Sequence, residues 1–325
     1  IAIQSFIVKK CEVNLTSVKL IHINEDFTYE GDANYKDLIN VENEITDKVI
    51  IEEKDVPNSI KDLTPLINKN NFPNIAMGGH CEKPYVCDYQ DRCKASLPKT
   101  NLTSYDILPY VGKNKKNIVY CNENGIEDLQ KFPTKFFRDH KSYAPGYHKI
   151  IQDAHKSNKS WFSPGLKGIF KDLNFPFFFM DFETVQQGVP IIKGTKPNYA
   201  LPFQWSVHKL ESIDKKIELN DAESFLKFDD QDIERKFVEE LLKAVGNHGT
   251  IFVHSAYEEK ALERLKDKDN CKDLADKIDK LIARIKDTLP IVRKNFYSPL
   301  MNGKYGIKSI IKATAPSNIN YDDKD

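Results

Sequence analysis

The sequence predicts an α/β protein whose C-terminal part is a mixed β-sheet with flanking helices. Three observations lead to this prediction. The apolar segment 177–180 runs directly into Asp181 and Glu183, which is the pattern of a strand that ends at a polar edge. Strand-like and helix-like patterns then alternate through the rest of the chain, as in α/β folds. Before this region, residues 1–98 carry a smaller α/β pattern and a cysteine-rich segment.

Composition restricts the class of protein. The chain has 325 residues, enough for two or three domains, and its 48 Lys and Arg residues balance 48 Asp and Glu residues. No global charge therefore points to nucleic acid or to a membrane surface. No apolar run approaches the roughly 20 residues of a membrane span, and no secretory signal is found. We expect a cytoplasmic protein with no membrane partner. Because the first residues already have a helical pattern, we also expect a piece of a longer protein.

Residues 1–98 are interpreted as the C-terminal part of an α/β module. Residues 1–8 are typical of a helix, and 18–23 of a strand with a hairpin partner at 27–29. Residues 36–70 alternate acidic loops and amphipathic helices, with prolines between them.

Three cysteines, Cys81, Cys87 and Cys93, lie within thirteen residues. The glycines and the proline around them allow a tight backbone to wrap a small centre. Three thiolates indicate zinc or an iron–sulfur cluster. No obvious fourth ligand lies near, and His80 and the distant Cys11 are the weak candidates. The alternative is three buried thiols without a metal.

Residues 99–172 are predicted to be a helical, basic connecting region. Between 131 and 171, nine Lys or Arg residues and two Asp residues leave an excess of seven positive charges. Three histidines and several aromatic residues are interleaved with them. Such a patch fits a phosphate backbone, and it fits a solvated helical linker equally well.

Residues 173–325 carry the pattern of the mixed sheet. The strand at 177–180 is expected to be buried on both faces, because it is a continuous apolar run. The other elements expected are strands at 203–210 and 249–255, helices at 224–246 and from 257 to about 286, and a last helix after 308.

Asp181 and Glu183 stand at positions i and i+2, so on a strand both carboxylates project from one face. Two like charges side by side favour a bound cation, and hard divalent ions prefer oxygen ligands. Glu258, in the first turn of the next helix, and Asp287, after that helix, would complete a cradle for two metal ions about 4 Å apart. The alternative is a solvated strand end that carries two acids by chance.

Residues 181–184, Asp-Phe-Glu-Thr, resemble the first motif of the DEDD, DnaQ-like 3′–5′ exonucleases of the ribonuclease H-like superfamily. Residues 253–258 resemble their second motif, with Ser255 in place of Asn and Glu258 in place of Asp. Residues 287–289, Asp-Thr-Leu, are similar to the segment that follows it. The last motif is not found before Asp325.

This resemblance implies a metal-dependent nuclease that hydrolyses DNA or RNA by a two-metal mechanism. Asp181, Glu183 and Glu258 would bind Mg²⁺ or Mn²⁺, and Asp287 would be a further catalytic acid. Since the last motif is missing, we expect this chain to cleave poorly by itself. The residues assigned to substrate contacts are Thr184, Gln204, His208, His254 and Lys308. Structural roles are the alternative for the two histidines and the lysine.

The cysteine-rich segment resembles the cysteine trio of RecB-like PD-(D/E)XK nucleases, which implies a [4Fe–4S] cluster whose fourth cysteine lies upstream. Gln4 matches the Gln of their Gln-x-x-x-Tyr motif, although Lys9 and not Tyr lies nearby. A bacterial family of uncharacterised proteins joins both modules in this order. It carries motifs like those at 202–208 (Pro-Phe-Gln-Trp-Ser-Val-His) and 303–308 (Gly-Lys-Tyr-Gly-Ile-Lys).

Two other hypotheses remain open at this point. In the first, the ribonuclease H-like domain is a non-catalytic module that positions nucleic acid for an upstream RecB-like nuclease. In the second, the protein is structural and its cysteines hold a zinc ion.

Overall fold

The computed structural model describes residues 1–69, 75, 79–81, 85–95, 107–111, 117, 120–121, 123–126, 128–217, 222–228 and 232–315. The chain divides into two compact units. Unit 1 comprises Ile1–Ile75, Glu183–Gln204 and Leu226–Glu234, and unit 2 comprises Ala76–Phe182, Trp205–Phe225 and Arg235–Asp325. The boundaries predicted at 98/99 and 172/173 stay predictions. None of the described helices has the length and the apolar character that crossing a bilayer requires.

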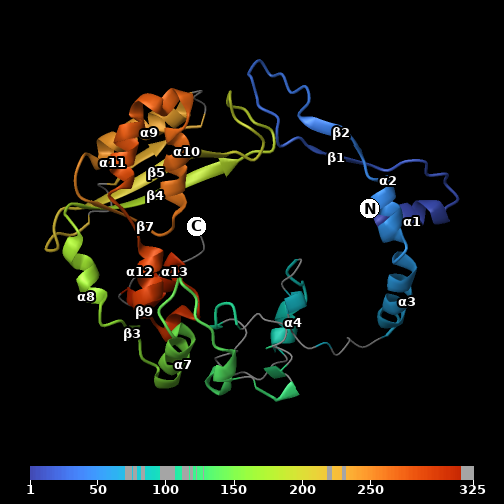
Figure 1. The fold of residues 1–325 in the computed structure, drawn as a ribbon, viewed down its shortest axis with the longest axis horizontal. Helices are drawn as coiled ribbons and strands as arrows, with labels where there is room; N and C mark the ends of the chain where they lie inside the picture. Colours follow the sequence, from blue (N-terminus) through green and yellow to red (C-terminus); the bar gives the residue numbers. More distant parts are fainter. Residues whose placement is uncertain are drawn as a thin grey trace. The chain divides into compact units, whose positions relative to one another are not determined.

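The N-terminal part of unit 1 is a small α/β segment (Figure 1). Its elements are α1 (Ala2–Lys10), β1 (Lys19–Ile23), β2 (Ile39–Glu44), α2 (Thr46–Glu53) and α3 (Val56–Ile67). β1 and β2 pair antiparallel, from Lys19 opposite Glu44 to Ile23 opposite Ile39, with an irregularity between Leu20 and His22.

The hairpin partner predicted at 27–29 is wrong, because β1 pairs with β2 instead. Tyr29 is buried, and its backbone N–H donates to Thr195 O at 3.0 Å. Its ring stacks on Tyr35 with the centroids 5.0 Å apart. Tyr29 is therefore held within unit 1 by contacts that leave its N–H unavailable to β1. In β2 the apolar residues Ile39 and Val41 alternate with polar residues, which is a strand pattern. Two apolar residues in an acidic segment are too few to predict this strand.

Unit 2 contains most of a five-stranded sheet in the order β6-β5-β4-β7-β8. Figure 1 labels β4, β5 and β7 of this sheet. The strands are β4 (Phe177–Gln186), β5 (Ala200–Leu210), β6 (Glu223–Leu226), β7 (Thr250–Val253) and β8 (Ile285–Asp287). β4 runs parallel to β7, and β7 runs parallel to β8. The prediction of an α/β protein with a mixed sheet and flanking helices is confirmed.

The helices and smaller strands of unit 2 complete its architecture. Among the described residues, its α-helices are α4 (Gln90–Ala95), α7 (Tyr147–Ser157), α8 (Leu166–Ile169), α9 (Ile233–Val245), α10 (Tyr257–Lys266), α11 (Ala275–Ile282), α12 (Thr288–Asn295) and α13 (Ile307–Thr314), of which α9 begins in unit 1. Its short 3₁₀ helices are Gly79–Cys81, Leu129–Lys131, Thr134–Phe136, Phe170–Asp172, Asp269–Leu274 and Pro299–Met301. A second, two-stranded sheet pairs β3 (Trp161–Phe162) with β9 (Phe296–Tyr297).

Two of the predicted helices are wrong in extent. The helix expected at 224–246 is strand β6 followed by α9, because Phe225 is buried beside Trp205 as part of the sheet. The helix expected from 257 to about 286 is α10, a 3₁₀ turn, α11 and then β8. β8 has only three residues, which is too short to show a periodicity in the sequence.

The core beneath α9 explains the burial of β4. The Phe237 ring of α9 is fully buried and lies 4.9 Å from the Phe182 ring and 5.6 Å from the Phe225 ring. Trp205 Nε1 donates to Phe237 O at 3.1 Å. On β4, Phe178, Met180 and Phe182 are buried, whereas Phe179 and Asp181 are exposed. The prediction that this strand is buried on both faces is therefore wrong; α9 covers one face.

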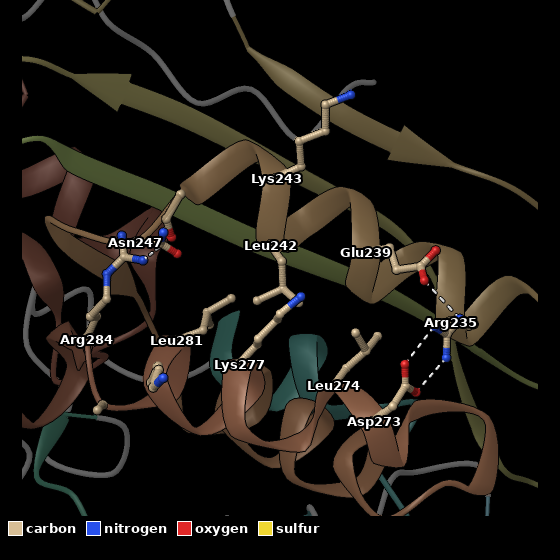
Figure 2. Close-up of a pocket in the computed structure, with 13 residues that line it drawn as sticks. Arg235, Glu239, Leu242, Lys243, Asn247, Asp273, Leu274, Lys277, Leu281 and Arg284 are labelled. Carbon is tan, nitrogen blue, oxygen red and sulfur yellow. Dashed lines mark hydrogen bonds and ion pairs between the residues drawn. The ribbon is translucent and has the colours of Figure 1, made fainter.

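A groove of about 1100 Å³ lies between α9 and α11 (Figure 2). At one end, Arg284 donates to four backbone carbonyls at and after the end of α9: Val245 O at 2.9 Å, Gly246 O at 2.6 Å, His248 O at 2.5 Å and Gly249 O at 2.9 Å. At the other end, Arg235 pairs with the exposed side chains of Asp273 and Glu239. Arg284 thus satisfies helix-terminal acceptors that have no partner within the helix.

Replacing Arg284 with Lys should lower the free energy of unfolding by about 2 kcal/mol, because one ammonium group cannot replace the planar fork that bonds four carbonyls. Urea unfolding followed by circular dichroism measures this change. Arg235→Lys is the matched control in the same groove, since its ion pairs are exposed and should be worth about 1 kcal/mol or less. Equal losses for the two variants would contradict the assigned role of Arg284.

Candidate functional site

The carboxyl ends of three parallel strands meet at one edge of the sheet. From β4 the chain adds β5 and β6 on one side and then β7 and β8 on the other. The strand order therefore reverses next to β4, between β4 and β7. In open α/β sheets, ligands bind at such a reversal, just outside the carboxyl ends of the strands. Three of the four predicted acids lie within unit 2 near this edge.

Asp181 lies on β4 two residues after Phe179, the last residue that pairs with β7. Its side chain is exposed and points away from the face that α9 covers, since Met180 and Phe182 are buried on that face. Glu183 follows at i+2 on the same face of the strand and is also exposed. The prediction that both carboxylates project from one face of the strand is confirmed.

Glu258 is the acid that the structure encloses. It lies in the first turn of α10, five residues after β7 ends at Val253, and only 5% of it is exposed. The Ser255 hydroxyl donates to Glu258 Oε2 at 3.3 Å, and the same Oγ accepts from Tyr257 N at 3.1 Å. Burial raises the pKa of the Glu258 carboxyl, and the negative charges of Asp181 and Asp287 raise it further. The structure thus brings Asp181 and Asp287 within electrostatic reach of Glu258.

Asp287 is the last residue of β8 and the N-cap of α12. Its Oδ1 accepts from Leu289 N at 2.8 Å, which fixes the orientation of the carboxylate. Its register partner on β7 is Val253, the residue from which the chain turns toward α10. A strand that the sequence did not predict therefore delivers Asp287 to the edge where Glu258 lies.

The four predicted acids have no ion-pair partner in the part of the chain that the structure describes. Within the described residues, no Lys, Arg or His forms an ion pair with Asp181, Glu183, Glu258 or Asp287. In the same part of the chain, no three His, Cys, Asp or Glu side chains are grouped as ligands of one metal ion. Asp181 and Asp287 are thus close enough to Glu258 to raise its carboxyl pKa. The described acids are not close enough together to form a ready set of three ligands for one metal ion.

Three predicted substrate contacts lie on β4 and β5. His208 and Gln204 are half-buried and alternate with the buried Trp205 and Val207, so both point away from α9. His208 thereby shares with Asp181 the sheet face that α9 leaves uncovered. Thr184 follows Glu183 on β4 and is half-buried.

His254, directly after β7, has both ring nitrogens bonded to protein atoms. Nε2 donates to Tyr305 O at 2.9 Å, and Nδ1 lies 2.8 Å from Thr288 Oγ1. Thr288 Oγ1 is also 2.9 Å from Val253 O. These bonds join β7, α12 and the segment before α13, so His254 braces the edge on which the acids lie. Lys308 is exposed on α13.

The cysteine-rich segment is described only in part. Cys81 is buried, Cys87 and Cys93 are half-buried, and Cys87 N donates to Cys81 O at 2.9 Å. None of the six cysteines forms a disulfide bond. The zinc or iron–sulfur centre stays a prediction, because residues 82–84 between these cysteines lie outside the described residues.

Comparison with known families bears on the same region. Residues 178–306 match a family described as Domain of unknown function (DUF2779). The match covers less than half of the chain and includes all four predicted acids, from β4 to the residue after Tyr305. It is consistent with the expected resemblance to an uncharacterised family. The curated proteins and the solved structures gave no match.

Two features of this edge were not anticipated. Thr288 follows Asp287 in the Asp-Thr-Leu segment, and its contact with His254 had no signal beyond that tripeptide. Arg293, further along α12, has a buried Nε without a hydrogen-bond partner among the described residues. An arginine near the end of a short helix carries no sequence pattern that would single it out.

Proposed function

We propose that the chain is a metal-dependent nuclease of the DEDD type on a ribonuclease H-like fold, and that it hydrolyses phosphodiester bonds of DNA or RNA. The observation that carries this proposal is the buried Glu258, whose carboxyl pKa is raised by burial and by Asp181 and Asp287. The position of these acids, at a strand-order reversal, is a second support. The assignment to 3′–5′ polarity rests on the resemblance of the two motifs.

The donor set fits a hard divalent cation. Carboxylate oxygens are the ligands that Mg²⁺ and Mn²⁺ prefer, and like charges that lie near one another, with no ion-pair partner among the described residues, favour such an ion. Asp181, Glu183 and Glu258 would hold the metal, with Asp287 as the fourth acid. When bound, the metal would lower the pKa of a water molecule and stabilise the charge on the leaving oxygen.

The residues of the chain would prepare this site in separate ways. Ser255 orients Glu258 through its hydroxyl, and Leu289 N orients Asp287 by donating to Oδ1 in the N-cap hydrogen bond of α12. His254 holds the ends of β7 and the start of α12 together through Thr288. His208, on the uncovered face, would contact the phosphate or orient water. Each of these contacts reduces the movement needed when substrate binds.

The test is cleavage of end-labelled single strands of DNA and RNA, with Mn²⁺ or Mg²⁺ titrated from zero. We expect slow, EDTA-sensitive shortening from one end and, independently, a rise in melting temperature on adding Mn²⁺. Robust cleavage would indicate that Asp287 completes the site within this chain. Binding of nucleic acid without any metal-dependent cleavage would favour the non-catalytic binding module instead.

A further inference from the structure

An exposed aromatic stack lies in unit 2 on the segment 107–111. Tyr110 is 62% exposed, and its ring stacks on His140 with the centroids 4.8 Å apart and the planes 19° apart. Tyr143 supports the pair from the edge, 6.1 Å from Tyr110 at 84°. His140 Nδ1 accepts from Ser142 N at 3.2 Å, which fixes the imidazole. One face of the Tyr110 ring is therefore covered by His140, and most of the side chain faces solvent.

Close backbone packing holds this segment in place. Pro109 O accepts hydrogen bonds from His148 Nε2 at 2.8 Å and from the Tyr147 hydroxyl at 3.3 Å. Gly303 has a φ of +74°, and a Cβ there would lie 2.1 Å from Ile107 O. Only glycine permits this approach. Tyr110 is thus displayed on a rigid support.

The Arg293 guanidinium lies beside the stack. The Arg293 guanidinium lies 5.2 Å from the centroid of the Tyr143 ring, and its buried Nε has no hydrogen-bond partner in the described part of the chain. A buried N–H group that is left unbonded is costly, and a hydrogen-bond acceptor that reached it would remove that cost. Arg138 and Lys141 add positive charge nearby in the sequence, against the single acid Asp139.

The stack is connected to the acidic edge of the sheet. Arg293 lies six residues after Asp287 on α12, which corresponds to about 9 Å along the helix axis. Tyr143 also packs edge-on against Tyr305, with the centroids 5.2 Å apart, and Tyr305 O accepts from His254 Nε2. Aromatic packing therefore runs from the surface at Tyr110 to the residue that braces the acids.

We infer that Tyr110, His140 and Arg293 form a nucleotide-binding subsite for single-stranded nucleic acid. A base stacks on the outer face of Tyr110, and an adjacent phosphate pairs with Arg293. This inference rests on the proposed function and specifies that its substrate is single-stranded. Only an unpaired base has a face that is free to stack on the Tyr110 ring. The groove between α9 and α11 also carries lysines, but no aromatic residue lines it.

The experiment measures binding of a fluorescent oligodeoxythymidine of about 12 nucleotides by anisotropy, in EDTA so that cleavage is prevented. Tyr110→Ala should weaken binding about tenfold, and Tyr110→Phe should retain it, because the ring face and not the hydroxyl is used. Arg293→Gln should reduce the slope of log affinity against log salt by about one. Lys280→Gln, in the groove between α9 and α11, is the matched control and should leave the affinity for the strand and the salt slope unchanged.

A second probe, the same strand with its bases removed, isolates stacking. The unmodified protein should prefer the intact strand, and Tyr110→Ala should abolish that preference while its melting temperature stays unchanged, since Tyr110 is exposed. If Tyr110→Ala keeps the preference, the inference is overturned, even if the protein cleaves nucleic acid. Asp181→Asn should keep the preference for the intact strand, because Asp181 is not part of the stacking subsite. If the unmodified protein prefers the intact strand but never cleaves it, only the proposed function is contradicted.

Discussion

Replacing Asp181 with Asn should reduce metal-dependent cleavage by about a thousandfold, the scale of loss when one electrostatic group of a catalytic site is removed. Asp181 is exposed on β4, so the substitution leaves the core beneath α9 intact. Its charge is one of the two that raise the pKa of Glu258, and it has no ion-pair partner among the described residues. The measurement is the single-turnover rate on a labelled single strand at saturating Mn²⁺.

The control for this variant is Asp276→Asn, because Asp276 is also exposed and lies on α11, a helix that carries none of the four predicted acids. It should cleave at the rate of the unmodified chain. A parallel measurement of Mn²⁺ affinity separates metal binding from chemistry: Asp181→Asn should bind Mn²⁺ more weakly, whereas Asp276→Asn should not. Unchanged cleavage by Asp181→Asn would refute the role assigned to this residue.

Replacing Glu258 with Gln should abolish cleavage to a similar degree and at the same time stabilise the metal-free protein by about 1 kcal/mol. The carboxyl of Glu258 is almost fully buried, and Asp181 and Asp287 oppose its charge. Gln keeps the shape and can still accept from Ser255, so the change removes an unfavourable charge without opening a cavity. Thermal unfolding at pH 8 in EDTA measures the gain.

The pH dependence of this gain follows from the raised pKa. Folded Glu258 holds its proton more tightly than the unfolded chain does, so the stability it contributes is complete below about pH 4.3, the ordinary value. That contribution is lost as the pH rises through the raised folded pKa. The stability advantage of Glu258→Gln should therefore be small at pH 4 and larger at pH 8.

Two controls make the Glu258 prediction specific. Mg²⁺ or Mn²⁺ should raise the melting temperature of the unmodified chain at pH 8 and should raise that of Glu258→Gln less. Glu239→Gln, which removes an exposed partner of Arg235 on α9, should slightly destabilise the protein. If Glu258→Gln lowered the melting temperature at pH 8, the ionised carboxylate would stabilise the fold. That result would contradict the prediction that its charge is unfavourable in the metal-free protein.

Local pattern was sufficient for several elements of the site. The apolar run before Asp181 predicted a strand, and the spacing of Asp181 and Glu183 placed both on one face. The short apolar segment before His254 predicted β7, and the start of the following helix predicted the position of Glu258. These predictions succeeded because each depends on residues that are adjacent in the chain.

Other elements depended on partners that are distant in the chain. β8 has three residues and exists because it pairs with β7, and β2 pairs with β1 across an acidic segment. The burial of only one face of β4 depends on where α9 packs. Neither the length nor the composition of these segments distinguishes them before the sheet is assembled.

The sequence alone determined the chemical character of the candidate site: carboxylates at the ends of strands, with the local geometry that puts Asp181 and Glu183 on one face. Only the tertiary structure decided which acids interact, since Asp181, Glu258 and Asp287 come from three elements that meet through parallel pairing. It also decided that both ring nitrogens of His254 are bonded to protein atoms, and that the buried Nε of Arg293 has no hydrogen-bond partner among the described residues. The physical reason is that burial and electrostatic coupling depend on distances between residues far apart in the chain, which no local pattern encodes.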